Sequence, residues 1–167
     1  EEAIQKGLRM IGQGMHGFVG NKDVETELLE EELAVPTDMR IFYLTKAFYE
    51  GYSIEKLYDL TKIDSWFLQR LKNIFDLHTA LKEYKALENL PNDLLREVKK
   101  KGFSDFQIAR FVLKSSDEQI GEDMLKVRAY RKERNILPSV KQIDTLAAEY
   151  PAHTNYLYLT YNGEDHD

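Results

Sequence analysis

Three glycines near the N-terminus have the GxGxxG spacing of loops that bind nucleotide phosphates, namely Gly12, Gly14 and Gly17. Such a loop binds phosphate when it follows a strand and opens a helix, because the first helical N–H groups then point at the anion. Here a helical pattern precedes the glycines, and Phe18-Val19-Gly20 after them opens no helix. We therefore interpret residues 12–20 as a glycine-rich loop and not as a nucleotide site.

Carboxylates and imidazoles could act as metal ligands or as acids and bases. Residues 23–33 carry six acidic side chains but no histidine, which favours a short helix with a solvated acidic face. No two of the four histidines have the i, i+4 spacing that places two metal ligands on one helical face. We expect surface or capping roles for the histidines, which are His16, His78, His153 and His166.

The sequence contains no GxSxG, HExxH or Walker motif. The absence of cysteine excludes thiol catalysis, disulfides and cysteine-ligated zinc or iron-sulfur sites. The sequence therefore predicts no catalytic, cofactor-binding or metal-binding residue in this chain.

Length and charge narrow the class of protein further. A chain of 167 residues can bury a core of its own, and a net charge of −6 argues against non-specific nucleic-acid binding. No apolar run approaches the roughly 20 residues that cross a bilayer, and no secretory signal is present, so we expect neither a nucleic-acid nor a membrane partner. The chain starts without methionine inside a helical pattern, which favours an excised piece or a processed product.

Helical periodicity dominates the chain and predicts an all-α fold with an extended, partly irregular C-terminal tail. Thr37 or Asp38 is expected to cap one helix, Ser53 the next, and Ser104 with Gln107 forms a capping box. Predicted helices cover 2–11, 23–33, 38–50, 53–60, about 64–84, 92–101, a segment opening at Ser104, and 122–134.

The apolar stripes of these helices give a predicted core. In the long helix the stripe includes Trp66 and Phe67, which we expect to be buried, and Leu125 lies on the apolar side of 122–134. A repeated pattern, Gly51-Tyr52-Ser53 and Gly102-Phe103-Ser104, ends one helix and caps the next. We predict an N-terminal segment (1–36), a helical core (37–136, with subdomains of about 38–88 and 90–136) and an extended connector (137–167).

Two short motifs suggest a free-standing binding module as an alternative. Residues 53–76 have helix-turn-helix spacing, but Asp64, Trp66 and Phe67 at the groove-facing end suit packing better than DNA. Gly102-Phe103-Ser104 resembles the loop of ubiquitin-associated domains, although Lys101 stands where methionine is usual there.

The C-terminal quarter, residues 139–162, has the pattern of neither a helix nor a flexible linker. From Tyr156 to Tyr161 the apolar and aromatic residues run almost without a break. An isolated domain would leave several of them exposed, so we expect this connector to dock on a neighbouring domain of a larger protein.

A resemblance covers essentially the whole chain in order. Thr37-Asp-Met-Arg-Ile41, Leu60-Thr-Lys-Ile-Asp-Ser-Trp-Phe-Leu68, Lys101-Gly-Phe-Ser-Asp105 and Val140-Lys-Gln-Ile-Asp-Thr-Leu-Ala-Ala-Glu149 closely resemble the oligomerisation domain of carbamoyl phosphate synthetase, in its large subunit or large-subunit-like region. Agreement is poorest from Gly12 to Leu33.

The resemblance implies a parent enzyme, an ATP-dependent carbon–nitrogen ligase, that makes carbamoyl phosphate from bicarbonate, glutamine-derived or free ammonia and two ATP. It implies two flanking ATP-grasp halves that hold ATP, magnesium or manganese, and potassium outside this chain, and a glutaminase subunit or domain. It also implies that this domain links the halves and contacts another copy. The string Tyr156-Leu-Tyr-Leu-Thr-Tyr-Asn-Gly163 looks more like the eukaryotic members and favours a cytoplasmic pyrimidine enzyme, with a mitochondrial or arginine-pathway enzyme as the alternative.

Two hypotheses follow. The first is a non-catalytic connector and oligomerisation domain, in which exposed aromatic side chains supply a self-complementary patch; the second is the free-standing binding module. The candidate aromatic residues for the patch are Phe42, Tyr43, Tyr49 and Trp66.

Overall fold

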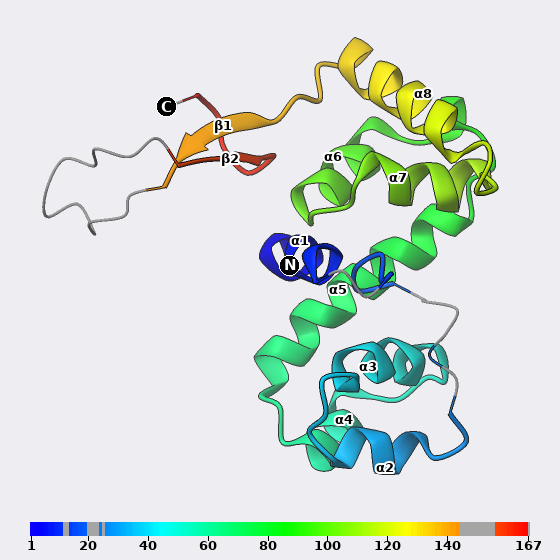
Figure 1. Ribbon diagram of the computed structural model, residues 1–167, viewed down its shortest axis with the longest axis vertical. Helices are drawn as coiled ribbons and strands as arrows, with labels where there is room; N and C mark the ends of the chain where they lie inside the picture. Colours follow the sequence, from blue (N-terminus) through cyan, green and yellow to red (C-terminus); the bar gives the residue numbers. More distant parts are fainter. Residues whose placement is uncertain (12–13, 20–23, 25, 144–155, 167) are drawn as a thin grey trace, which may run out of the picture. The chain divides into compact units, whose positions relative to one another are not determined.

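The computed structural model describes residues 1–11, 14–19, 24, 26–143 and 156–166, and the chain divides into two compact units, Glu1–Lys85 and Ala86–Asp167 (Figure 1). In the described residues nearly all regular structure is helical, and the strands are one short antiparallel pair near the C-terminus. The prediction of an all-α fold with an extended tail is therefore confirmed.

The first unit is built around one long helix, α5, against which α3 and α4 pack, while α2 contacts both α3 and α4 (Figure 1). Helix α1 lies beside α5, since the Glu1 carboxylate accepts a hydrogen bond from Asn73 Nδ2 at 3.0 Å. The helices are α1 (Glu2–Met10), α2 (Leu29–Ala34), α3 (Arg40–Tyr49), α4 (Ile54–Thr61) and α5 (Ser65–Lys82). The largest fully buried apolar side chains of this unit are Phe18, Leu33, Phe42, Leu44, Leu57, Leu68, Ile74 and Leu81.

The second unit packs three helices and carries the two strands at its C-terminal end (Figure 1). A 3-10 turn (Leu87–Asn89) leads into α6 (Asn92–Lys100), α7 (Asp105–Ile108), a π-helical turn (Ala109–Leu113), α8 (Ile120–Glu133), β1 (Ser139–Gln142) and β2 (Leu157–Thr160). The strands pair with Ser139 opposite Thr160 and Gln142 opposite Leu157. The core of this unit includes Leu95, Val98, Phe103, Ile108, Val112 and Val127.

The repeated glycine-aromatic-serine pattern forms the same joint in both units. Gly51 and Gly102 have φ angles of 79° and 86°, in the left-handed region that favours glycine. The backbone N–H of the aromatic residue after each glycine donates a hydrogen bond back across the last helical turn. The donor–acceptor distance is 2.9 Å for the Tyr52 N–H and 3.0 Å for the Phe103 N–H. A serine then caps the next helix: Ser53 accepts from the Lys56 N–H, and Ser104 forms the predicted capping box with Gln107.

The start of α3 differs from the prediction. Neither Thr37 nor Asp38 caps this helix, which begins at Arg40 after Met39. Instead the Arg40 guanidinium donates to the Leu33 carbonyl at 2.6 Å and to the Ala34 carbonyl at 3.1 Å, which ties the end of α2 to the start of α3. The acidic helix is also shorter than the predicted range of 23–33, because it begins at Leu29.

Several predictions of burial and exposure are wrong. Trp66 and Phe67 are 56% and 53% exposed, and Leu125 is 63% exposed. Trp66 lies two residues before the buried Leu68, which at about 100° per residue places it about 200° around the helix from the core stripe. Phe42, expected on an exposed patch, is buried at 1% exposure.

Candidate functional site

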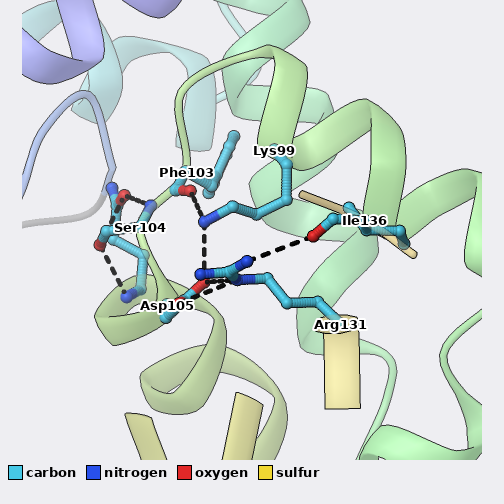
Figure 2. Close-up of polar contacts among 7 residues, drawn as sticks. Lys99, Phe103, Ser104, Asp105, Arg131 and Ile136 are labelled. Atoms are coloured by element: carbon cyan, nitrogen blue, oxygen red, sulfur yellow. Dashed lines mark hydrogen bonds and ion pairs between the residues drawn. The ribbon is translucent and has the colours of Figure 1, made fainter. Parts of the chain in front are cut away.

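A buried ion cluster joins α6, α7 and α8 in the second unit (Figure 2). Lys99 Nζ donates to Asp105 Oδ1 at 2.8 Å and to the Phe103 carbonyl at 2.8 Å. Arg131 Nε lies 3.1 and 3.0 Å from the two carboxylate oxygens of Asp105, and its Nη1 donates to the Ile136 carbonyl at 3.2 Å. The cluster therefore fixes three helices and the residue just before the connector to one another.

Local sequence places each member of this cluster. Ser104 has an extended backbone conformation and caps α7, so Asp105 is the first residue of that helix. Lys99 lies in the last turn of α6, where a cation interacts favourably with the helix dipole. Arg131 lies in the last turn of α8, one turn before Asn135 turns the chain toward β1 with a φ of 54°.

Tyr161 closes the cluster from the C-terminal tail. Its ring centroid lies 4.9 Å from Lys99 Nζ and 5.7 Å from the Arg131 guanidinium carbon. The negative face of the aromatic ring attracts both cations of the cluster. Burial raises the pKa of the Tyr161 hydroxyl to about 12, against a smaller lowering of the pKa by the charge of Arg131.

Hydrogen bonds hold the residues that follow β2 to α6 and to β1. Asn162 Nδ2 donates to the Lys100 carbonyl at 3.0 Å, at the end of α6. The Ser139 hydroxyl donates to the Gly163 carbonyl at 3.0 Å. A Cβ built on Gly163 would lie 3.0 Å from side-chain atoms of Ser139 and Lys141, so a larger residue here would have to displace these side chains.

The outer strand of this pair exposes its apolar side chains. Tyr156, Leu157, Tyr158 and Leu159 are between 46% and 60% exposed, while Thr160 is buried. The predicted exposure of the C-terminal aromatic run is therefore confirmed for Tyr156 and Tyr158, whereas Tyr161 is half-buried. Together the ion cluster and Tyr161 hold an apolar strand outside the helical core, an arrangement that suits a docking surface.

The glycine-rich loop packs on α1. The Phe18 N–H donates to Gln5 Oε1 at 2.9 Å, and both Phe18 and Gln5 are fully buried. Gly14 and Gly17 have φ angles of 71° and 101°, whereas Gly12 lies outside the described residues. The loop follows a helix, as the sequence indicated, and its described part is a packed turn.

The histidines lie apart from one another where the structure describes them. His78 is buried on the core face of α5, contrary to the predicted surface role, and its Nδ1 lies 2.9 Å from the Tyr49 hydroxyl. It follows Ile74 by four residues and Leu71 by seven, so it shares their helical stripe. His16 is exposed, as predicted, His166 Nδ1 accepts the Val140 N–H at 3.0 Å, and His153 lies outside the described residues.

The acidic segment makes surface ion pairs. Glu30 Oε1 lies 2.6 Å from Lys56 Nζ. The hydrogen bond from Lys56 lowers the pKa of the Glu30 carboxyl. Within the part of the chain that the structure describes, no three His, Asp or Glu side chains lie together so that they could hold a metal ion, and no helix combines the length and the apolar character of a membrane span.

Sequence patterns do not reveal Lys99, Asp105 and Arg131 as a cluster. They give Arg131 a favourable place near the end of a helix and Asp105 a place inside a capping box, without a partner for either. The three residues are separated by 6 and 26 positions, so no periodicity connects them. The available signal is Asp105 itself, a charged residue that directly follows the capping serine in the stretch Phe103-Ser-Asp-Phe106.

Comparisons with known proteins cover both units. Residues 1–135 match the family described as "Carbamoyl-phosphate synthetase large chain, oligomerisation domain". The chain is 50% identical over 167 residues to "Multifunctional protein CAD" of Squalus acanthias and 48% identical over 168 residues to "Multifunctional protein pyr1-3" of Dictyostelium discoideum. It is 45% identical over 168 residues to "Carbamoyl phosphate synthase arginine-specific large chain, mitochondrial" of Schizosaccharomyces pombe. All of this chain is covered in each case, and it spans 7%, 7% and 14% of the length of those relatives.

Proposed function

The chain belongs to the family of carbamoyl-phosphate synthetase large-chain oligomerisation domains, and from this premise we propose that it links two catalytic halves of a larger synthetase and contacts a second copy of itself. The observation that carries the proposal is the match over residues 1–135 together with 45–50% identity across the chain's full length to much longer proteins. The exposed apolar strand β2 supports it, because such a strand suits contact with a neighbouring domain.

We propose that the parent chain makes carbamoyl phosphate from bicarbonate, ammonia and two ATP, with a glutaminase subunit or domain as the source of ammonia. ATP, magnesium or manganese, and potassium would then bind in the flanking halves. No catalytic, cofactor or metal role is assigned to a residue of this chain. We also propose residues 137–167 as the connector to the following half, and a cytoplasmic enzyme of pyrimidine synthesis as the parent.

Self-association is tested by sedimentation equilibrium of the 167-residue chain over a wide range of concentration. We expect the weight-average mass to rise with concentration. The control is the variant Leu159→Lys, which places a charge on the exposed strand. This charge suppresses association that occurs through β2 and leaves association through other surfaces intact. A strictly monomeric chain at the highest concentration would contradict the proposed contact between copies.

The free-standing binding module gains no support. Helices α4 and α5 do form a helix-turn-helix arrangement, but α5 presents Asp64, Trp66 and Phe67 at its start. The family match also extends over both units. Binding of ubiquitin or duplex DNA to the chain would reverse this assignment.

A further inference from the structure

An aromatic pair stands exposed at the start of α5 in the first unit. The rings of Trp66 and Phe67 meet edge to face, with centroids 4.9 Å apart and an interplanar angle of 88°. Both side chains are more than half exposed. Tryptophan is among the residues that most often anchor an interface, because it buries a large area at low cost in conformational entropy.

The first residue of the chain lies beside this pair. The Arg70 guanidinium lies over the Trp66 ring, 4.8 Å from its centroid. Arg70 Nη1 is also 3.7 Å from the Glu1 carboxylate, which is held by Asn73 as well. The Glu1 side chain therefore lies one side chain, that of Arg70, away from Trp66.

We infer that Trp66 and Phe67 form the docking site for the synthetase half that precedes Glu1 in the parent chain, an inference that rests on the proposed function. The surface of that preceding half would present an apolar pocket to the two rings. A domain joined to Glu1 by a short flexible segment would be held near the pair at an effective concentration on the order of millimolar. A second copy has no such advantage at the concentrations of most cellular enzymes.

Photocrosslinking in the full-length parent tests this assignment. Trp66 is replaced by p-benzoylphenylalanine, an aromatic photoreactive residue, and the products are mapped by mass spectrometry. The matched control replaces Thr79, an exposed residue of the same helix, in the same way. We expect crosslinks from position 66 within one chain, to the half that precedes Glu1, and fewer such crosslinks from position 79.

Each other outcome overturns the inference. Crosslinks from position 66 to a second copy would identify the pair as the self-association surface, and crosslinks to the following half would assign it there. Equal yields from positions 66 and 79, or none from either, would leave the pair without a docking role. If the parent still self-associates in sedimentation, such a result refutes the docking site alone and leaves the proposed function standing.

A second measurement uses limited proteolysis of the parent just before Glu1. Trp66→Ser should raise the cleavage rate about tenfold or more, as expected when an anchoring tryptophan is lost, while Trp66→Phe should retain most of the protection. Because Trp66 is exposed in this chain, circular dichroism of the 167-residue variants should show unchanged folding. Equal cleavage rates for both variants and the parent would contradict the inference.

Discussion

Replacing Asp105 with asparagine tests the ion cluster of the second unit most directly. The change keeps the shape of the side chain but removes the charged carboxylate that pairs with Lys99 and Arg131, whose side chains are 5% and 10% exposed. Removing one partner of a buried ion pair costs about 3–5 kcal/mol in free energy of unfolding. Asparagine retains one accepting oxygen, so we expect a loss near the lower end, about 3 kcal/mol.

Urea unfolding followed by far-ultraviolet circular dichroism measures this loss. For a slope of about 2 kcal/mol per molar urea, the midpoint should fall by about 1.5 M. The matched control is Asp93→Asn, which removes the same charge from the exposed first turn of α6. Its free energy of unfolding should change by about 0.5 kcal/mol or less.

Hydrogen exchange locates the effect. The amides of Val127 and Tyr130 in α8 should lose about a hundredfold of their protection in Asp105→Asn, because opening of this helix becomes cheaper. The double variant Asp105→Asn with Lys99→Met should recover part of the stability, since it removes one of the two cations that paired with Asp105. If Asp105→Asn costs no more than Asp93→Asn, the cluster does not stabilise the second unit and the reasoning fails.

Three further predictions concern the tail and α8. Spectrophotometric titration should show a tyrosine with a pKa near 12 that is absent in Tyr161→Phe. Because the pKa of this hydroxyl is raised in the folded protein, the free energy of unfolding should fall as pH rises from about 10 to about 12. Gly163→Ala should force Ser139 aside and speed hydrogen exchange in β1, and unchanged exchange would refute the close approach. Hydrogen bonds from Lys126 and, less strongly, from Ser115 lower the pKa of the Asp123 carboxyl. Its contribution to the free energy of unfolding should therefore be complete above about pH 3.9 and lost as pH falls through the lower folded pKa. Urea midpoints that fall equally with pH in Asp123→Asn would contradict this.

Local signals in the sequence predicted the helices and their joints. The capping box of Ser104 and Gln107 and the left-handed turns at Gly51 and Gly102 depend on residues within a few positions of one another, so the sequence alone carries them. The resemblance to the synthetase family, carried by strings along the chain, is confirmed by the comparisons.

Features set by tertiary packing could not be predicted in the same way. Pairing of Lys99, Asp105 and Arg131 depends on how three helices meet, which no periodicity records. His78 was predictable in part, because it shares the stripe of Leu71 and Ile74, but histidine is not counted among apolar residues. The exposure of Trp66 and Phe67 contradicts their hydrophobic type and follows from their angular position on α5.

The outer strand of the tail has a consequence for handling the protein. In the described part of the chain β2 belongs to a two-stranded sheet, and its side chains Leu157 and Leu159 are more than half exposed. An exposed apolar strand in such a small sheet is a template for irregular aggregation between chains. Expression apart from the parent should therefore produce visible precipitation on concentration, and a lysine at position 159 should act as a gatekeeper that keeps the protein in solution.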